Sequence, residues 1–150
     1  MKSQDNIRHG RSVVYALTVH LVFVTKFRRG VIIDRVRDCL KEAFASVMAD
    51  FGGTLLQCDG EDDHVHLLAA YPPKHSVAAL VNSLKGVSAR LLRKRNFPDV
   101  RRKLWGDHFW TPSYFAASTG GASIDTVRKY IEDQRIPRKR GPKGAASSQP

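Results

Sequence analysis

The chain has 150 residues, which is enough for one domain with a substantial core but not for two domains of ordinary size. Its hydrophobic fraction of 42% excludes a disordered polypeptide, and its formal charge of +11 favours a polyanionic partner, with nucleic acid ahead of an anionic membrane. A merely basic protein without such a partner is the alternative that charge alone leaves open.

Cysteine usage and hydropathy bear on where the protein works. Cys39 and Cys58 are the only cysteines, and they form neither a C-x-x-C pair nor a disulfide framework. No apolar stretch reaches the length of about eighteen residues that a membrane helix needs, and the N-terminal residues lack the apolar centre of a signal peptide. We therefore expect a cytoplasmic protein without a membrane partner.

The first half of the chain predicts a strand, a helix and two further strands. Residues 12–27 are rich in β-branched and aromatic residues and predict one long strand, in which His20 is satisfied by a neighbouring group. Apolar residues at helical spacing follow Asp34, a candidate N-cap, and predict an amphipathic helix that ends near Gly52. Two short strands are then predicted around an acidic turn, at residues 53–58 and 64–71.

The second half predicts a helix, a strand and a last helix. Ser76 is a candidate N-cap for a helix with an apolar stripe up to Leu92, and a loop or broken short helix follows at residues 96–107. Pro112 marks a bulge or an edge in the last predicted strand. That strand covers residues 108–118, a linker covers 119–123 with Ser123 as a cap, and the last helix covers about 123–136.

The order of these elements predicts the fold class. Strand, helix, strand, strand, helix, strand is the β-α-β-β-α-β order of the ferredoxin-like α+β fold, an antiparallel sheet with helices on one face. The last helix would be appended to this unit. We therefore expect a single domain over residues 1–136 and, because Pro, Gly, Ser and basic residues dominate it, a disordered basic tail at residues 137–150.

Two histidines one residue apart form the first candidate site. On a strand, residues i and i+2 point to the same face, so His64 and His66 project together and could chelate a divalent metal. Two histidines at this spacing on a strand are more often simply exposed on the surface or packed against neighbours. Asp62 and Asp63 adjoin it and could orient an imidazole, although solvated turn residues are the favoured interpretation.

The last helix carries the second half of the candidate site. Tyr130 and Gln134 are four residues apart and lie on one helical face beside an apolar stripe. Taken alone, they predict a packed tyrosine ring and a solvated glutamine. Taken with the histidines, they predict more, because a tyrosine hydroxyl can attack a phosphodiester while a metal bound by two imidazoles and one amide oxygen keeps positions open for phosphate.

Four segments together resemble a known family. They are HLVFVTKFRRGVI (20–32), HVHLLAAYPPKHSVAALVNSLKGVSARLL (64–92), LWGDHFWTPSYFAAST (104–119) and TVRKYIEDQ (126–134). From about residue 13 to residue 135, the chain resembles the small single-tyrosine HUH transposases of bacterial insertion sequences. The histidine-hydrophobic-histidine element is a loose motif by itself, but its combination with the other segments and the Y-x-x-x-Q spacing is highly specific.

The resemblance implies a transposase that cleaves and rejoins single-stranded DNA. It implies the ferredoxin-like fold, a homodimer, and DNA with hairpins near the ends of the mobile element. Tyr130 matches the nucleophile, which forms a 5′-phosphotyrosine link, and His64, His66 and Gln134 match the ligands of a divalent metal. The implied metal is Mg²⁺, and Mn²⁺ is expected to substitute for it because imidazole suits later metals. In the family, the catalytic helix typically completes the partner's site.

Basic residues are the candidates for contact with DNA. They are Lys26, Arg28, Arg29, Lys85, Arg90, Arg93, Arg101 and Arg102. Phe109 and Trp110 are candidates for stacking on bases. Each of these is individually common as a solvated charge or a core ring.

Two other functions stay open at this point. One is a non-catalytic module that binds single-stranded nucleic acid, although the aromatic pattern of such modules is not found in the sequence. The other is a related HUH enzyme that acts on repeated genomic palindromes. Hairpins next to the gene favour self-mobilisation, whereas scattered palindromes favour the second alternative.

Overall fold

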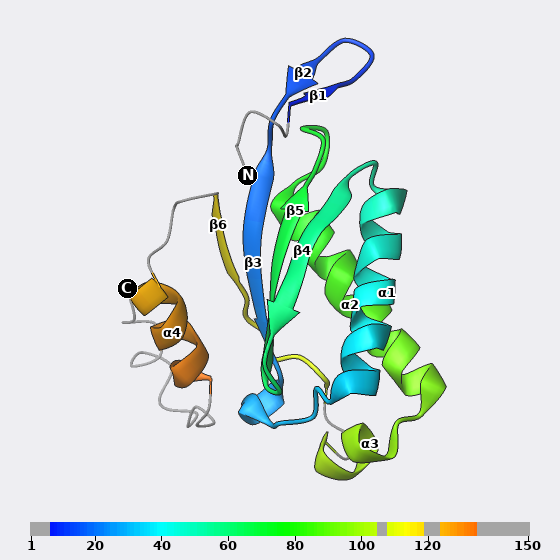
Figure 1. Ribbon diagram of the computed structural model, residues 1–150, viewed down its shortest axis with the longest axis vertical. Helices are drawn as coiled ribbons and strands as arrows, with labels where there is room; N and C mark the ends of the chain where they lie inside the picture. Colours follow the sequence, from blue (N-terminus) through cyan, green and yellow to red (C-terminus); the bar gives the residue numbers. More distant parts are fainter. Residues whose placement is uncertain (1–6, 105–107, 119–123, 135–150) are drawn as a thin grey trace, which may run out of the picture.

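A four-stranded antiparallel sheet forms the centre of the computed structural model, which describes residues 7–104, 108–118 and 124–134, and the side chains of the last range from Lys129 onward (Figure 1). The sheet has the order β4-β5-β3-β6. Its strands are β3 (Thr18–Val24), β4 (Thr54–Gly60), β5 (His64–Ala70) and β6 (Phe115–Ser118).

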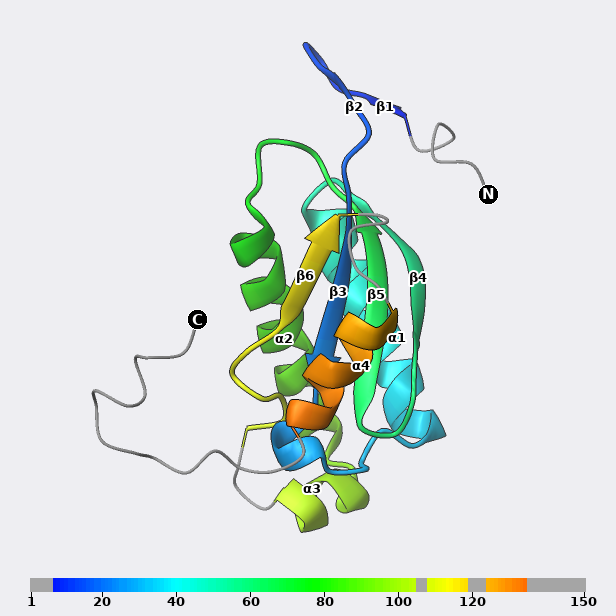
Figure 2. The ribbon, with the colours of Figure 1, turned by 90° about the vertical axis from the view of Figure 1, so that its left-hand side faces the viewer.

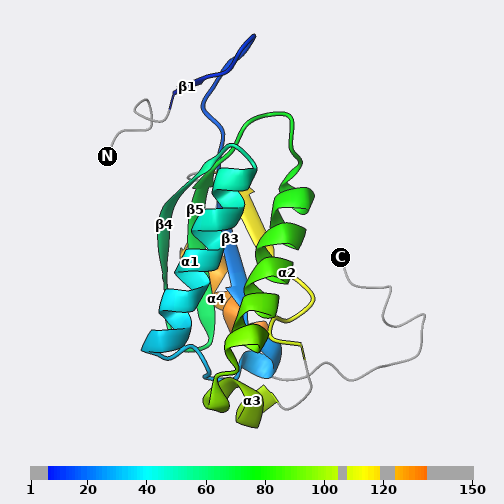
Figure 3. The same cartoon turned by 90° about the vertical axis from the view of Figure 1, so that its right-hand side faces the viewer.

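The connections between these strands are those of the ferredoxin-like fold. Helix α1 (Asp34–Asp50) joins β3 to β4 across β5, and helix α2 (Val77–Arg95) joins β5 to β6 across β3, so the two β-α-β units interleave. Both helices lie on the same face of the sheet (Figure 3). The predicted fold class is therefore confirmed.

Helix α4 (Ile124–Asp133) lies on the opposite face of the sheet (Figures 1 and 2). Because successive strand residues point to opposite faces, β3 contributes side chains to both faces of the sheet. Leu21 and Phe23 belong to the main core with α1 and α2, whereas Val22 and Val24 form a second, smaller cluster with Ile131 of α4. Strand β3 is thus buried on both sides.

Aromatic rings fill the main core at the level of Phe23. Phe23 makes edge contacts with Phe44 of α1 and with Trp110, and Trp110 is also perpendicular to Phe109. The Trp110 indole Nε1 donates to Ser88 Oγ at 3.0 Å. Phe109 and Trp110 are both buried, so the prediction that they stack on bases is wrong. Burial of rings this large stabilises the core.

The N-terminal strand is shorter than predicted. Residues 12–27 contain two strands, β2 (Val14–Tyr15) and β3. Strand β2 pairs with β1 (Arg8–His9), and a 3₁₀ turn at Lys26–Arg28 ends the extended backbone. The cause is a change of partner along the segment, since β2 pairs with β1 and β3 pairs with β5 and β6. Pattern alone reports extended backbone and not the partner.

Other boundaries differ in detail. Ile33 is the N-cap of α1, and Asp34 is its first residue, whereas Ser76 caps α2 as predicted and accepts from Ala79 N. The broken helix appears as α3 (Pro98–Leu104). The last strand contracts to β6, at the edge of the sheet and beyond Pro112, with one isolated bridge between Thr25 and Trp110. Three predictions lie outside the described residues: the linker at 119–123 with its Ser123 cap, the end of the last helix at 135–136 and the tail at 137–150.

Gly60 closes the hairpin that carries the histidines. Its φ is 153°, and a Cβ at this position would come within 2.8 Å of Val65 Cα and closer still to the His64 carbonyl oxygen. Glu61 N also donates to that carbonyl oxygen at 3.0 Å. The start of β5 is therefore packed directly against the backbone of Gly60, which leaves no room for a side chain.

We expect Gly60→Ala to lower the free energy of unfolding by about 1–3 kcal/mol, because the backbone of the hairpin must move apart. Urea denaturation measures this change. Gly52→Ala is the matched control, since Gly52 also has a positive φ of 77° but its Cβ would meet only Pro72 at 3.8 Å. Equal losses in the two variants would contradict a steric role for Gly60.

Candidate functional site

Strand β5 holds His64 and His66 on the face of the sheet that α4 covers. In the antiparallel register, Val24 is opposite His64 and Val22 is opposite His66, and both valines pack against Ile131 of α4. The two imidazole centroids are 4.9 Å apart. The period of the strand thus brings the pair together, as the sequence predicts.

Asp63 fixes one side of the His64 ring. Its Oδ1 lies 2.7 Å from His64 Nδ1, and its Oδ2 accepts from Arg28 Nε at 2.6 Å. Burial alone would raise the pKa of Asp63, but the bonds from His64 and Arg28 outweigh burial and hold that pKa below its usual value. Asp63 is only 8% exposed, so its interpretation as a solvated turn residue is wrong. Asp62 is exposed and fits that interpretation.

His20 contacts the other histidine of the pair. Its Nε2 lies 3.3 Å from His66 Nδ1, which confirms that His20 is satisfied by a neighbour. Burial lowers the pKa of His20. Burial, followed by the charges of His64 and His20, lowers the pKa of His66 to about 4. His66 is therefore a neutral imidazole at neutral pH, which is the form that binds a metal.

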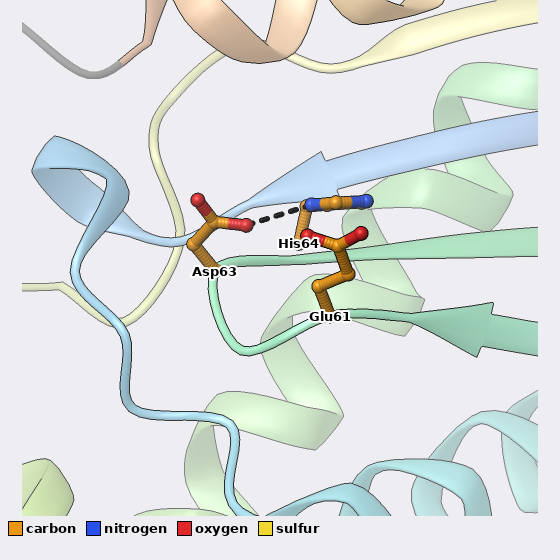
Figure 4. Close-up of side chains that lie close together, drawn as sticks. All are labelled: Glu61, Asp63 and His64. Carbon is orange, nitrogen blue, oxygen red and sulfur yellow. Dashed lines mark hydrogen bonds and ion pairs between the residues drawn. The ribbon is translucent and has the colours of Figure 1, made fainter.

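The donor atoms in this cluster suit a divalent cation. Ligand atoms of Glu61, Asp63 and His64 all lie within 4.8 Å of one another, and Figure 4 shows the Glu61 carboxylate beside the His64 ring. The Nδ1 atoms of His64 and His66 face Asp63 and His20, and an Nδ1 that carries the ring proton leaves the Nε2 atom of the same ring to bind a cation. Nitrogen and carboxylate donors together favour Mn²⁺ and later metals over Mg²⁺. Sequence reasoning missed Glu61, although the acidic run before His64 was a signal for it.

Tyr130 and Gln134 are bonded to the segment that leads into β6. The Tyr130 hydroxyl lies 2.8 Å from Ser113 Oγ, and Gln134 Oε1 accepts from Thr111 Oγ1 at 3.2 Å. The Tyr130 ring packs against Phe115, with centroids 6.0 Å apart. Burial raises the pKa of Tyr130, and the hydrogen bond with Ser113 opposes that rise. The tyrosine ring is therefore packed, as the helix alone predicts, and Gln134 is partly exposed and hydrogen-bonded.

Strand β3 separates these two residues from the histidines. Val22 is opposite His66 on one side and opposite Phe115 on the other, so one strand lies between the β5 and β6 side chains of this row. Neighbouring strands are about 4.8 Å apart. Among the described residues, no hydrogen bond joins Tyr130 or Gln134 to either histidine. The two halves of the predicted site share a face of the sheet but lie on opposite sides of β3.

Lys85 holds the segment on which Tyr130 and Gln134 rest. Its Nζ donates to the carbonyl oxygens of Thr111, Pro112 and Ser113 at 2.7, 3.3 and 3.2 Å. Burial lowers the pKa of Lys85 to about 8. Lys85 therefore has a structural role here. The ammonium group that was predicted to contact DNA donates hydrogen bonds to three backbone oxygens instead.

The other predicted DNA contacts divide into two groups. Arg28 is engaged with Asp63, and Lys26 is partly buried. Five are exposed, namely Arg29, Arg90, Arg93, Arg101 and Arg102. Arg102 is paired with Asp99, whereas Arg93 and Arg101 line a hollow of about 330 Å³ along α2 and α3, and Arg90 and Arg93 line an adjoining hollow of about 550 Å³. Exposed positive charge from α2 therefore borders both hollows, and charge from α3 borders the first of them.

Hydropathy adds one observation on the helices. In the part of the chain that the structure describes, no helix combines the length and the apolar character needed to cross a bilayer.

Comparison with known proteins identifies the family of this chain. The profile of the family described as "Transposase IS200 like" matches residues 13–134. The ISDra2 transposase TnpA of Deinococcus radiodurans is 34% identical over 128 residues, which is 85% of this chain and 91% of that protein. The transposase for insertion sequence element IS200 of Salmonella typhimurium is 29% identical over 134 residues, which is 89% of this chain and 85% of that protein.

Solved structures extend the likeness to the fold. A Deinococcus radiodurans protein assigned as a transposase superposes with a TM-score of 0.73 at 34% identity, over 87% of this chain and 99% of that one. A REP-associated tyrosine transposase bound to a REP hairpin superposes with a TM-score of 0.51 at 12% identity, over 83% of this chain and 68% of that one. The family match, the close relative and the shared fold lead to one conclusion: this chain belongs to the IS200-like transposase family, a family of DNA-processing enzymes.

Proposed function

We propose that this protein cleaves and rejoins single-stranded DNA at the ends of an insertion sequence, with Tyr130 as the nucleophile and a divalent metal bound by His64, His66 and Gln134. The observation that carries the proposal is the common face of the sheet, where the histidine pair and the helix bearing Tyr130 both lie. The metal is Mg²⁺ or, in its place, Mn²⁺. When bound, it would withdraw charge from the phosphate oxygens.

The chemistry proposed for Tyr130 is a transesterification. The phenolic oxygen attacks phosphorus, the bond from phosphorus to the 3′ oxygen breaks, and a 5′-phosphotyrosine and a free 3′-hydroxyl result. The tyrosine proton leaves and the departing 3′ oxygen gains one. One phosphodiester replaces another, so no nucleotide fuel is needed. Rejoining is the same exchange run with a new 3′-hydroxyl.

Deprotonation of Tyr130 is the step that needs assistance. Burial raises its pKa, so the phenol is protonated at neutral pH. The Tyr130 hydroxyl lies 2.8 Å from Ser113 Oγ. This hydrogen bond must break before the phenolic oxygen can approach the phosphate group. We propose that the helix leaves Ser113 and Thr111 when it enters a working site, because both catalytic side chains are bonded to that segment.

A homodimer with shared sites would bring the two halves together. Tyr130 and Gln134 are held on the β6 side of β3, whereas His64 and His66 stand on its β5 side. Movement of α4 to a second subunit would place its side chains over that subunit's histidines. We therefore propose that each active site combines the histidines of one subunit with the helix of the other.

Single-stranded DNA with hairpins near the element ends is the proposed substrate. The exposed Arg90 and Arg93 of α2 and Arg101 of α3 border two adjoining hollows that could follow a phosphate backbone. The REP-associated structure with the same fold holds a REP hairpin, which supports a hairpin ligand. The alternatives are a non-catalytic binding module, which the adduct experiment below tests, and an enzyme that acts on repeated palindromes.

The low pKa of His66 gives a test of whether the fold holds this imidazole neutral. Its pKa is about 4 in the folded protein and near 6.5 in an unfolded chain, so the unfolded state binds more protons between these values. Stability therefore rises with pH in this window. The contribution of His66 is complete above pH 6.5 and is lost as the pH falls toward 4.

We expect His66→Gln to flatten the dependence of unfolding free energy on pH between 6.5 and 4. Urea denaturation of the metal-free protein at several pH values measures this dependence. His9→Gln, on the N-terminal hairpin away from the sheet, should follow the wild-type curve. Identical slopes for wild type and His66→Gln would show that His66 is not held neutral by the fold.

Substitution of the nucleophile tests the reaction itself. We expect Tyr130→Phe to abolish the covalent adduct between the protein and labelled single strands from the flanking DNA, while strand binding persists. A denaturing gel with Mg²⁺ or Mn²⁺ measures the adduct, and EDTA should remove it from the wild type. Tyr71→Phe is the matched control, because Tyr71 packs against the main core on the other face. An adduct that survives Tyr130→Phe would exclude this mechanism.

Mixing of inactive subunits tests shared sites. Tyr130→Phe and His64→Ala proteins, when mixed, should regain up to about a quarter of wild-type cleavage, since half of the dimers are mixed and one of their two sites is intact. A mixture of Tyr130→Phe with Gln134→Ala should stay inactive, because both changes lie on the same helix. Absence of rescue in both mixtures would argue for sites built within one subunit.

A further inference from the structure

We propose that Arg28 and Asp63 position His64 for the metal by fixing which of its nitrogens carries the proton. This inference rests on the proposed function, in which His64 is a ligand. Arg28 Nε donates to Asp63 Oδ2 at 2.6 Å, and Asp63 Oδ1 faces His64 Nδ1 at 2.7 Å. The three side chains form one hydrogen-bonded row that ends at the candidate ligand. Asp63 and His64 are 8% and 7% exposed, so water hardly competes for these bonds.

The backbone that presents Arg28 is unusual. Phe27 and Arg28 have φ values of 56° and 57°, in the left-handed region that residues other than glycine rarely adopt. Such a conformation persists only where the surroundings determine it, and it is common at functional sites. In this turn, its consequence is to direct the Arg28 guanidinium toward Asp63.

Buried bonds hold the turn and Asp63 together. Thr25 is fully buried, and its Oγ1 donates to Arg29 O at 2.6 Å and approaches Asp63 O at 3.1 Å. Thr25 N also donates to Asp63 O at 3.0 Å, and Lys26 N donates to Phe109 O at 2.9 Å. One threonine therefore fixes both ends of the interaction between Arg28 and Asp63. The rigid mounting indicates a positioning role, since a contact made only with DNA would not need it.

The carboxylate determines the tautomer of His64. An ionised carboxylate only accepts hydrogen bonds, so the proton of a neutral His64 must be on Nδ1, which leaves the Nε2 lone pair for a cation. Arg28 occupies the second carboxylate oxygen and keeps Asp63 from turning away. Arg28 is thereby reassigned from a predicted DNA contact to a positioning residue.

An amide at position 63 gives the sharpest test. In Asp63→Asn, Arg28 must still find an acceptor, so the amide oxygen faces Arg28 and the amide nitrogen faces His64. That nitrogen donates, and the His64 proton must then move to Nε2, where it blocks the metal. In the double variant Arg28→Ala/Asp63→Asn, the amide is free to turn its oxygen to His64, and the original tautomer should return.

Nitrogen-15 NMR of the metal-free, DNA-free protein measures the tautomer directly. We expect the Nδ1–H form for His64 in the wild type, the Nε2–H form in Asp63→Asn and a return toward Nδ1–H in the double variant. A wild-type Nε2–H form, or no change in Asp63→Asn, would overturn the inference. Far-ultraviolet circular dichroism checks that each variant is folded.

Titration with Mn²⁺ alone, followed by electron paramagnetic resonance, gives the second readout. We expect Asp63→Asn to weaken Mn²⁺ binding about 10–100-fold and the double variant to recover part of that loss. Arg29→Ala is the matched control, because Arg29 lies next to Arg28 but Asp63 is paired with Arg28. The Arg29 guanidinium lies instead over the Phe27 ring, 5.8 Å from its centroid. Equal weakening by Arg29→Ala would point to a general disturbance of the turn and contradict the assignment.

The tests of His64 positioning and of the strand-transfer reaction can fail independently. If Tyr130 makes no adduct but the tautomer and Mn²⁺ affinity change as expected, the positioning of His64 stands and the strand-transfer reaction fails. If the adduct forms but Asp63→Asn leaves the tautomer and the metal affinity unchanged, the reaction stands and this inference fails.

Discussion

The antiparallel register between β3 and β5 is the constraint on which the site depends. It sets Val24 opposite His64 and Val22 opposite His66, so the face that carries the imidazoles is also the face on which Ile131 of α4 packs. A slip of β5 by one residue would turn both histidines into the main core. Strand β3 buries Leu21 and Phe23 on its other side, and this two-sided burial fixes the register.

Polar contacts then build two separate positions on that face. On the β5 side, Arg28 and Asp63 hold His64, while His20 lies against His66. On the β6 side, Lys85 ties down the segment from Thr111 to Ser113, whose side chains hold Gln134 and Tyr130. The first position suits a cation and the second holds a nucleophile. Their separation by β3 is why we propose that two subunits combine.

Local patterns predicted the parts of the structure that depend on neighbours in sequence. Strand period predicted that His64 and His66 share a face, helical spacing predicted α1 and α2, and the element order predicted the fold. Contacts between distant residues could not be predicted. Arg28 and Asp63 are 35 residues apart, and Lys85 lies 26 residues from Thr111, so their charges appeared available for DNA. Trp110 appeared available for stacking because composition does not report that Phe23 and Phe44 enclose it.

In the proposed reaction, Tyr130 carries the DNA during strand transfer. Mass spectrometry of the trapped adduct, after digestion with trypsin and nuclease, tests it most directly. Cleavage after Lys129 and Arg135 releases the peptide from Tyr130 to Arg135, which contains a single hydroxyl nucleophile of this kind. We expect a nucleotide phosphate on Tyr130 in this peptide. A phosphate on any other residue, with this peptide unmodified, would contradict it.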